Sequence, residues 1–426
     1  MFYLDKMEHV GGKESGKKSG KKSGKESGKK ALRDDGEDVY LMEPMRISEE
    51  NQARPELTEL VLELTKRSSS FRSSLPKGLT EPLADFVRSM NCYYSNLIEG
   101  HDTHPVDIER ALNDDLAKDD PKKRDLQLEA KAHIEVQRWI DEGGLQNREG
   151  TVEGIRDIHR RFTRLLPDEL RWVEHRDKEE KVEVIPGEMR EHDAKVGHHI
   201  AISPGAIPRF MKRFEERFFG LKDFEAILAA GPAHHRLLFI HPFADGNGRV
   251  TRLMSYATLH RTLDTGGLWS IARGLARRVA DYKKHLLACD EVRKGDLDGR
   301  GHLTEAALSS FTSFFLEVCI DQTNFMNELM QPKSLRERIM KWAEEEAAYG
   351  RLPGKSPRIL DAILFRGSLP KSEVAEVLGQ SARSARDATS ALSKQGIITS
   401  PGAREDWQLA FPARLAPRIA PGLFPE

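Results

Sequence analysis

Apolar residues recur at helical spacing along most of the chain. From Pro55 onward, Leu57, Leu60, Val61 and Leu64 stand at positions i, i+3, i+4 and i+7, which is the spacing of one helix face. Similar patterns predict further helices over residues 86–100, 125–141, 151–165 and 204–219. We therefore expect a mainly α fold.

The helical period disappears between residues 181 and 203. Val182, Val184 and Ile185 favour extended structure, and Val196, Ile200 and Ile202 do so again. We expect a strand or extended turn around Pro186 and Gly187, followed by a β-hairpin over 196–202.

A further apolar stripe, Ala233, Leu237 and Ile240, leads into His241. Pro232 fits the first turn of this helix, where its missing N–H costs nothing. We expect the imidazole of His241 to stand at the end of a rigid, packed helix, which suits a group that must be held in position.

Three short helical patterns and a strand-like stretch follow residue 355. They cover 359–364, 372–378, 381–394 and 396–409, which is the order of a winged helix-turn-helix. The third helix carries Arg383, Arg386 and Lys394 against Asp387, as a helix entering a DNA major groove would. Such modules also act as dimer or protein-docking units, so a DNA partner and a homodimer both stay open.

Composition narrows the class of protein. The 426 residues carry a formal net charge of −1, which offers no overall electrostatic argument for nucleic acid or membrane binding. Cys92, Cys289 and Cys319 form no C-x-x-C pair, so we expect neither a disulfide framework nor a thiolate zinc site. Because neither an apolar run of membrane-spanning length nor a signal-peptide pattern is present, we expect a cytoplasmic protein without a membrane partner.

The first residues differ in composition from the rest. Residues 11–30 are a near-repeat of Gly, Lys, Ser and Glu without a large apolar side chain. Such a segment cannot bury enough apolar surface to offset the conformational entropy lost on folding. We expect a disordered tail over 1–35. It could serve as a solvated linker or as a basic arm for nucleic acid.

The densest chemistry lies in the stretch His241-Pro242-Phe243-Ala244-Asp245-Gly246-Asn247-Gly248-Arg249, with a second arginine at Arg252. Its glycines let backbone N–H groups approach a ligand closely, and the start of a helix favours an anion. Arg249 and Arg252 are neighbours on the helix surface and can close on the same anion. A phosphate-bearing ligand suits this stretch better than a turn-rich surface loop does.

Every fixed position of the stretch matches HPFxDGNGRxxR, the signature of the Fic family, which the chain thereby resembles. Ser95-x-x-x-Glu99-Gly100 also resembles the [S/T]xxxE[G/N] inhibitory motif of that family. There the inhibitory Glu pairs with the second signature arginine, here Arg252. The alternative for Ser95 and Glu99 is the polar face of an ordinary amphipathic helix.

The resemblance implies a Fic-type helical core with a small β-hairpin flap, which clamps a target segment by main-chain pairing. It makes His241 the catalytic base, Ser95 and Glu99 regulatory, and Asp245 the ligand of Mg²⁺. Tyr282 could stack on a nucleobase or pack in the core. The nucleotide-binding set comprises Val196, Gly197, His198, His199, Asp245, Gly246, Asn247, Gly248, Arg249, Val250, Thr251, Arg252 and Tyr282.

The function implied is a self-inhibited protein adenylyltransferase. It would transfer AMP from ATP to a Ser, Thr or Tyr hydroxyl of a target protein and of itself. One alternative uses the same site to remove AMP from a modified protein. Another is a nucleotide-sensing DNA-binding regulator that acts through the winged helix.

The resulting domain order has five parts. A tail over 1–35 precedes an N-terminal helical region over 36–110, whose inhibitory helix covers about 86–100. A Fic core over 111–265 and its helical extension over 266–350 follow. The winged helix-turn-helix over 355–426 completes the chain.

Overall fold

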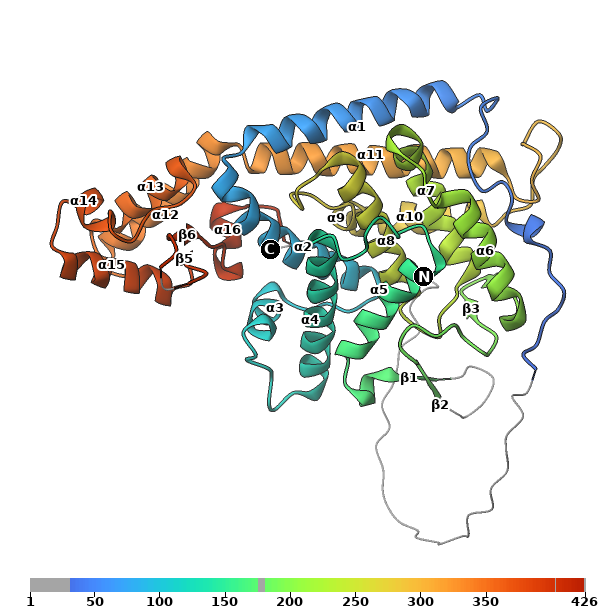
Figure 1. Cartoon of the computed structure of the whole chain (residues 1–426), viewed down its shortest axis with the longest axis horizontal. Helices are drawn as coiled ribbons and strands as arrows, with labels where there is room; N and C mark the ends of the chain where they lie inside the picture. The colour runs from blue at the N-terminus through green and yellow to red at the C-terminus, as the bar shows by residue number, and fades with distance from the viewer. Residues whose placement is uncertain (1–30, 175–180, 403, 425–426) are drawn as a thin grey trace, which may run out of the picture.

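A computed structural model of the chain describes residues 31–174, 181–402 and 404–424. Within these ranges helices carry most of the chain, and the strands are short antiparallel pairs (Figure 1). The helices are α1 (Arg54–Ser74), α2 (Lys77–Ile98), α3 (Pro105–Leu112), α4 (Pro121–Asp141), α5 (Val152–Leu165), α6 (Ile207–Phe218), α7 (Asp223–Ile240), α8 (Asn247–Leu263), α9 (Ala272–Arg277), α10 (Val279–Cys289), α11 (Glu305–Leu329), α12 (Pro332–Ala348), α13 (Ser356–Arg366), α14 (Val374–Leu378), α15 (Ala382–Lys394) and α16 (Ala416–Ile419).

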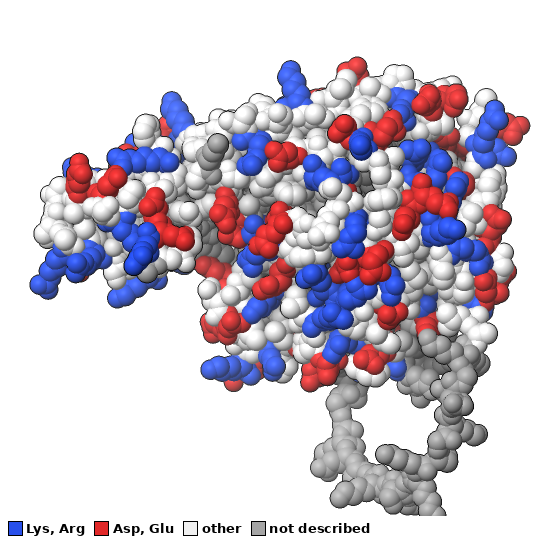
Figure 2. Space-filling view, viewed as in Figure 1, with Lys and Arg blue, Asp and Glu red and all other residues white. Residues whose placement is uncertain are grey.

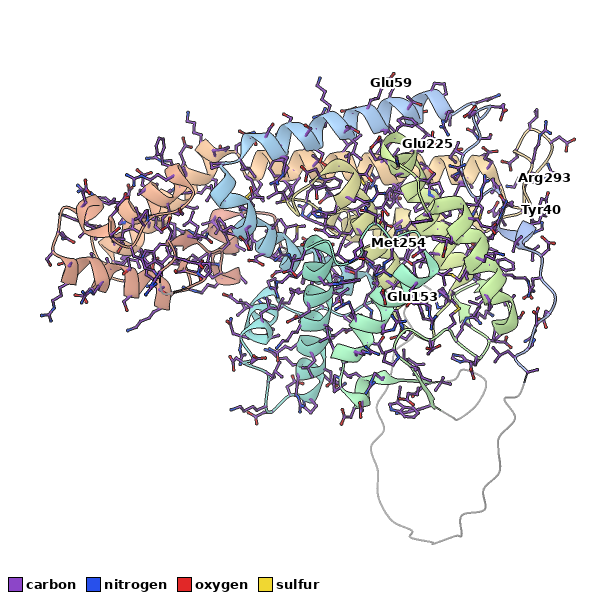
Figure 3. All side chains as sticks on the ribbon, viewed as in Figure 1. Tyr40, Glu59, Glu153, Glu225, Met254 and Arg293 are labelled. Carbon is purple, nitrogen blue, oxygen red and sulfur yellow. The ribbon has the colours of Figure 1, made fainter. Side chains whose placement is uncertain are left out.

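Two helix pairs organise the body of the molecule. α1 and α11 lie side by side along one edge, and α7 packs against α8. Met254 of α8 is 2% exposed and lies near the middle of the molecule, whereas Tyr40 and Arg293 lie at its periphery (Figure 3). Arg54 of α1 donates to Glu225 of α7 at 2.6 Å and so connects the two pairs.

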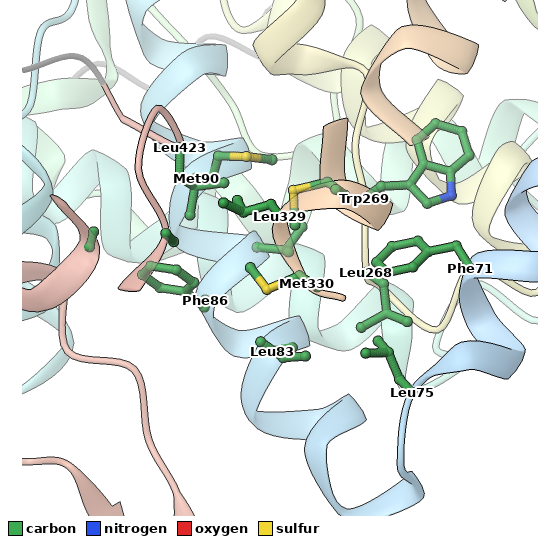
Figure 4. Packing of buried hydrophobic residues seen from close by; sticks show 14 of the residues in the cluster. Phe71, Leu75, Leu83, Phe86, Met90, Leu268, Trp269, Leu329, Met330 and Leu423 are labelled. Atoms are coloured by element: carbon green, nitrogen blue, oxygen red, sulfur yellow. The ribbon is translucent and has the colours of Figure 1, made fainter. Parts of the chain in front are cut away.

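The buried apolar side chains form two clusters. The smaller cluster contains residues of the helices α4 through α8 and of the 3-10 helix η1 (Val39–Met42). The larger joins α1, α2, α9 and α11 to the C-terminal helices. In the larger cluster, Leu83, Phe86 and Met90 of α2 pack among Met330 and Leu423, which come from distant parts of the chain (Figure 4).

The predicted helices are present, and two of them begin earlier than expected. The helix predicted over 86–100 is α2, which starts at Lys77 because Leu79 and Leu83 are also buried. Pro232 was expected in a first turn but lies inside α7, which starts at Asp223. The preceding residues Ala226–Ala230 are buried, and their burial offsets the hydrogen bond that the proline removes.

The strands confirm the predicted hairpin and add a second one. β3 (Lys195–Val196) and β4 (His199–Ile200) pair antiparallel, with Gly197 at φ 60° in the turn. The extended segment near Val182 is β2 (Lys181–Glu183), whose partner β1 (Trp172–Glu174) is too short to leave a sequence pattern. Two further 3-10 helices, η2 (Asp168–Arg171) and η3 (Pro204–Ala206), flank these hairpins.

Residues 1–30 of the predicted disordered tail lie outside the described residues, so that part of the prediction stays untested. The end of the tail is attached to the body. The backbone N–H of Asp35 donates to Ser203 Oγ at 3.1 Å, and Arg33 pairs with Asp193. These polar contacts connect the chain to the body from Arg33 onward, and the boundary at residue 35 stays a prediction.

The C-terminal helices α12–α15 project from the body together with β5 (Ile398–Thr399) and β6 (Gln408–Leu409) (Figure 1). α13, α14, α15 and the β5–β6 pair follow one another in the predicted order. Charges of both signs are mixed over the visible face, in keeping with the net charge of −1 (Figure 2). The assignment as a winged helix-turn-helix and the five-part domain division stay predictions.

None of the helices in the described ranges combines the length and the hydropathy that a bilayer-spanning segment needs.

The fold predicts that buried and exposed phenylalanines differ sharply in their contribution to stability. Phe315 of α11 is fully buried beside Gly231 of α7, whereas Phe365 of α13 is 85% exposed. Phe315→Ala should lower the free energy of unfolding by about 3–5 kcal/mol, because it leaves a cavity. Phe365→Ala, the matched control, should change it by less than about 0.5 kcal/mol. Urea unfolding measures both, and equal losses would contradict this packing.

Candidate active site

The loop that joins α7 to α8 reverses the chain through two left-handed residues. His241 ends α7 with φ 50° and ψ 61°, and Gly246 precedes α8 with φ 78°. Glycine adopts this conformation freely, but a histidine pays about 1–2 kcal/mol for it. The loop must therefore be held by its surroundings, and three buried side chains hold it.

Arg190 holds the backbone on either side of the His241 peptide. Its Nε donates to the carbonyl of His241 at 2.7 Å, and its backbone N–H donates to that of Pro242 at 2.9 Å. Its Nη2 donates to the carbonyl of Ile202, just after the flap β3–β4, at 2.6 Å. Burial lowers the pKa of Arg190 to about 10, which leaves it charged at neutral pH. Arg190 thus fixes His241 relative to the flap.

Asn247 closes the loop on itself. Its Oδ1 accepts from the backbone N–H of Phe243, and its Nδ2 donates to the carbonyl of the same residue, both at 2.9 Å. The side-chain amide is therefore used inside the protein. A ligand would meet the backbone of this segment rather than the Asn247 side chain.

His159 of α5 packs against the loop. Its ring stacks on Phe243 with 3.9 Å between ring centroids, and its Nδ1 accepts from the backbone N–H of Gly187 at 2.9 Å. Burial lowers the pKa of His159 to about 3, so the ring is neutral and can accept. His159 is therefore a buried histidine that packs against the loop.

The imidazole of His241 is half-buried at the end of α7. Burial lowers the pKa of His241 to about 3, and the charges of Arg190 and His199 act in the same direction. At neutral pH the ring is uncharged, which is the form that can accept a proton.

Arg252 is bound on two sides by the end of α2. Its Nε donates to Ser95 Oγ at 2.9 Å, and its Nη2 donates to the Ser95 carbonyl at 3.0 Å and to Glu99 Oε1 at 2.5 Å. Burial opposes ionisation of Glu99, but Arg252 and Arg249 together hold its pKa below its usual value. The pairing of Glu99 with Arg252 that the resemblance implies is present.

The same carboxylate lies over the start of α8. A Cβ placed on Gly248 would come within 2.2 Å of Glu99 Oε1. Glu99 thus occupies the place where Gly248 allows an anion to approach the helix N-terminus. A carboxylate there stands in for a phosphate oxygen, since both are anions that such a terminus favours.

Arg249 is held by residues that the sequence did not indicate. It pairs with Glu129 of α4, stands 4.8 Å above the Phe162 ring, and donates to Asp245 Oδ2 at 3.1 Å. Glu129 is itself 2.7 Å from Nδ1 of His101, which directly follows the Glu99-Gly100 pair. Burial lowers the pKa of Arg249 to about 10, so it remains cationic at neutral pH.

Asp245 is the residue expected to hold Mg²⁺, and its side chain is 49% exposed at the mouth of the loop. No cluster of three or more His, Cys, Asp or Glu suited to a metal occurs in the part of the chain that the structure describes. Mg²⁺ commonly takes one or two carboxylates and completes its octahedron with phosphate and water oxygens. A single accessible carboxylate beside a phosphate site fits that pattern.

Several residues of the predicted nucleotide-binding set turn away from the loop. Val250 and Thr251 are 1% and 0% exposed, and the Val250 backbone N–H is bonded to Gly246. Tyr282 is 3% exposed with its hydroxyl 2.7 Å from His234 Nε2, which favours core packing over base stacking. The side chains of these three residues point inward from α8 and α10, and their contact with a nucleotide stays a prediction.

The flap residues lie on the other side of His241. His199 turns toward α7, with its Nε2 2.8 Å from the Phe239 carbonyl and its Nδ1 3.4 Å from Asp290. Val196 and His198 are partly exposed beside the Gly197 turn. Their contact with a nucleotide stays a prediction.

Comparison with known proteins agrees with this geometry. Residues 150–259 match the sequence model of the Fic/DOC family. Protein adenylyltransferase Fic of Drosophila erecta is 30% identical over 171 residues, which cover 40% of this chain and 31% of that protein. The protein of the same name from Drosophila persimilis is 30% identical over 172 residues, covering 40% and 30%. The match spans about a third of the length of these curated relatives.

A solved structure of a Fic family protein from Desulfovibrio desulfuricans G20 has a similar fold. The TM-score is 0.51 at 16% sequence identity, over 86% of this chain and 98% of that chain. This likeness confirms the predicted mainly α fold, with its Fic-type helical core.

The Glu99–Arg252 pair predicts a defined pH dependence of stability. Because the folded-state pKa of Glu99 lies below its ordinary 4.5, the charged carboxylate stabilises the fold above about that pH. This contribution is lost as the pH falls through the lowered value. Thermal unfolding of wild type and Glu99→Gln should differ at pH 7 and converge in acid.

Glu142 provides the matched control, since it is exposed and ends α4 as Glu99 ends α2. Wild type and Glu142→Gln should therefore unfold at nearly the same temperature both at pH 7 and in acid. A difference between wild type and Glu99→Gln that persists unchanged below pH 3 or so, well under the ordinary carboxyl pKa, would contradict the ion pair.

Proposed function

We propose that the chain is a protein adenylyltransferase held inactive by its own α2, which the match of residues 150–259 to the Fic/DOC family supports. The hydroxyl oxygen of a Ser, Thr or Tyr side chain would attack the α-phosphorus of ATP. The new P–O bond replaces the bond to the β-phosphate, and pyrophosphate leaves with the electron pair. The product is an AMP ester of the target protein.

One observation carries this proposal: a neutral imidazole on a fixed backbone stands beside an anion site that Glu99 occupies. The His241 ring can accept the hydroxyl proton without first losing one. Gly248 leaves room for the Glu99 carboxylate at the start of α8, and the guanidinium of Arg252 donates to the same carboxylate. Preorganised donors of this kind stabilise the charge that develops on phosphate oxygens.

Each remaining task has a residue suited to it. Arg249 and Arg252 would bind the distal phosphates, because both are buried cations at the start of α8. Asp245 would hold Mg²⁺, which when bound neutralises phosphate charge. The flap would present the target, since Ile200 of β4 is 74% exposed beside a strand edge that can pair with an extended segment.

Self-inhibition follows from the competition for Arg252. A guanidinium that donates to Ser95 and Glu99 cannot at the same time orient the γ-phosphate of ATP. Charge-assisted hydrogen bonds of this kind contribute about 1.5–3 kcal/mol. The productive complex would be disfavoured by about one to two orders of magnitude.

Replacing Glu99 tests both parts of the proposal. Glu99→Gly should raise transfer of label from α-labelled ATP to the protein itself, or to a protein in a lysate, by about 10- to 100-fold. Adding His241→Ala to this variant should abolish the labelling. Glu142→Gly, which makes the same change at the equivalent position of α4, should leave it unchanged.

The outcome also separates the alternatives at this site. If Glu99→Gly transfers no more label than its His241→Ala derivative does, the transferase proposal fails. If replacement of Glu99 instead prevents removal of AMP from an already modified protein, the site performs the reverse, hydrolytic reaction.

A second candidate function concerns the C-terminal unit. Arg383, Arg386 and Lys394 of α15 are exposed, with Asp387 among them, which suits a DNA-binding helix. If this unit binds DNA, a mobility shift of duplex DNA should be lost on Arg383→Ala combined with Arg386→Ala. Absence of a shift with the wild-type protein would leave docking of a protein, including a second copy of this chain, as the role of the unit.

A further inference from the structure

The segment 411–424, which follows β6, packs against the helix that carries the inhibitory residues. The Phe86 ring of α2 lies 5.8 Å from Phe411 and 5.9 Å from Phe424, between ring centroids. Tyr93, two residues before Ser95, lies 5.8 Å from Phe424 in an edge-to-face arrangement. Leu423 is fully buried beside Met90 (Figure 4).

The same segment also holds the element that follows Glu99. The backbone N–H of Ala413, in the 3-10 helix η4 (Ala413–Leu415), donates to Glu109 of α3 at 2.9 Å. The segment therefore contacts α2 before the Ser95–Glu99 motif and α3 after it. Both ends of the inhibitory turn are fixed by one piece of chain.

The segment is in turn tied to the body and to the C-terminal unit. Arg273 of α9 donates to the Gly422 carbonyl at 2.9 Å, and Arg338 of α12 donates to that of Ile419 at 2.7 Å. At its start, the Ala410 backbone N–H donates to the Ile397 carbonyl at 2.8 Å, beside the β5–β6 pair. A displacement of the unit 356–410 would thus be transmitted directly to the segment.

We propose that segment 411–424 is an intramolecular clamp that determines how firmly α2 holds Glu99 on Arg252. Displacement of the C-terminal unit, by whatever that unit binds, loosens the clamp and frees Arg252 for a phosphate. This proposal rests on the self-inhibition proposed above. It assigns the C-terminal unit a regulatory action on the active site.

The test replaces Phe424 in two backgrounds. Phe424→Ala should raise self-labelling from α-labelled ATP by about fivefold when Glu99 is present, which is the factor expected for loss of aromatic pairing. In the Glu99→Gly background it should have no further effect, because no inhibitory contact is left to weaken. The matched control is Phe365→Ala, which removes an exposed ring from the same C-terminal unit.

Hydrogen exchange of the backbone amides of residues 95–101 gives a second readout. These amides close the last turn of α2; for example, His101 donates to the Asn96 carbonyl at 2.9 Å. They should exchange faster in Phe424→Ala than in Phe365→Ala. If Phe424→Ala does not fold, Phe424→Leu provides the same comparison with less loss of volume.

The outcomes are separable. Labelling that falls equally in both backgrounds would make the segment a support of the whole fold and overturn the clamp, as would unchanged labelling with unchanged amide exchange. If no variant labels, including Glu99→Gly, the proposed function itself fails. The clamp is then judged by amide exchange alone: faster exchange supports it, and equal exchange overturns it.

Discussion

A buried guanidinium requires a partner, and the partner of Arg252 determines how the molecule is built. Arg252 is 4% exposed on α8, and its guanidinium donates hydrogen bonds to Ser95 and Glu99 at the end of α2. An uncompensated buried charge costs several kcal/mol. α8 therefore needs either α2 in this position or another anion. The apolar side of α2 completes the larger core, so the helix that binds Arg252 is also one that the fold depends on.

The loop before α8 shows how a strained backbone is kept in place. His241 adopts a left-handed conformation. Glycine would adopt it with less strain, but glycine has no imidazole. Arg190 and Asn247 hydrogen-bond the backbone around His241, and His159 stacks on Phe243. These contacts hold the loop in place and position the half-buried His241 ring.

Local patterns predicted much of this structure, and contacts between distant residues account for the rest. The period of apolar residues located most helices, and the glycines and arginines of one stretch located the anion site. The roles of Glu129 and His101 could not be recognised in the sequence, because each is a single polar residue whose partner comes from another part of the chain. The role of Arg190 was not indicated by the sequence, because its contacts with the loop backbone depend on how the flap folds. Tyr282 was ambiguous because its role depends on whether α10 faces a cavity or α7.

Glu99 and Arg252 belong to the same polypeptide chain, which affects how the site responds to its surroundings. The carboxylate is tethered 153 positions from its arginine within one chain, so its local concentration is set by the fold and does not change when the protein is diluted. Free nucleotide, by contrast, arrives from solution and competes in proportion to its amount. In the proposed mechanism, the balance at Arg252 therefore does not depend on the protein concentration, and a rising level of the phosphate-bearing ligand shifts it.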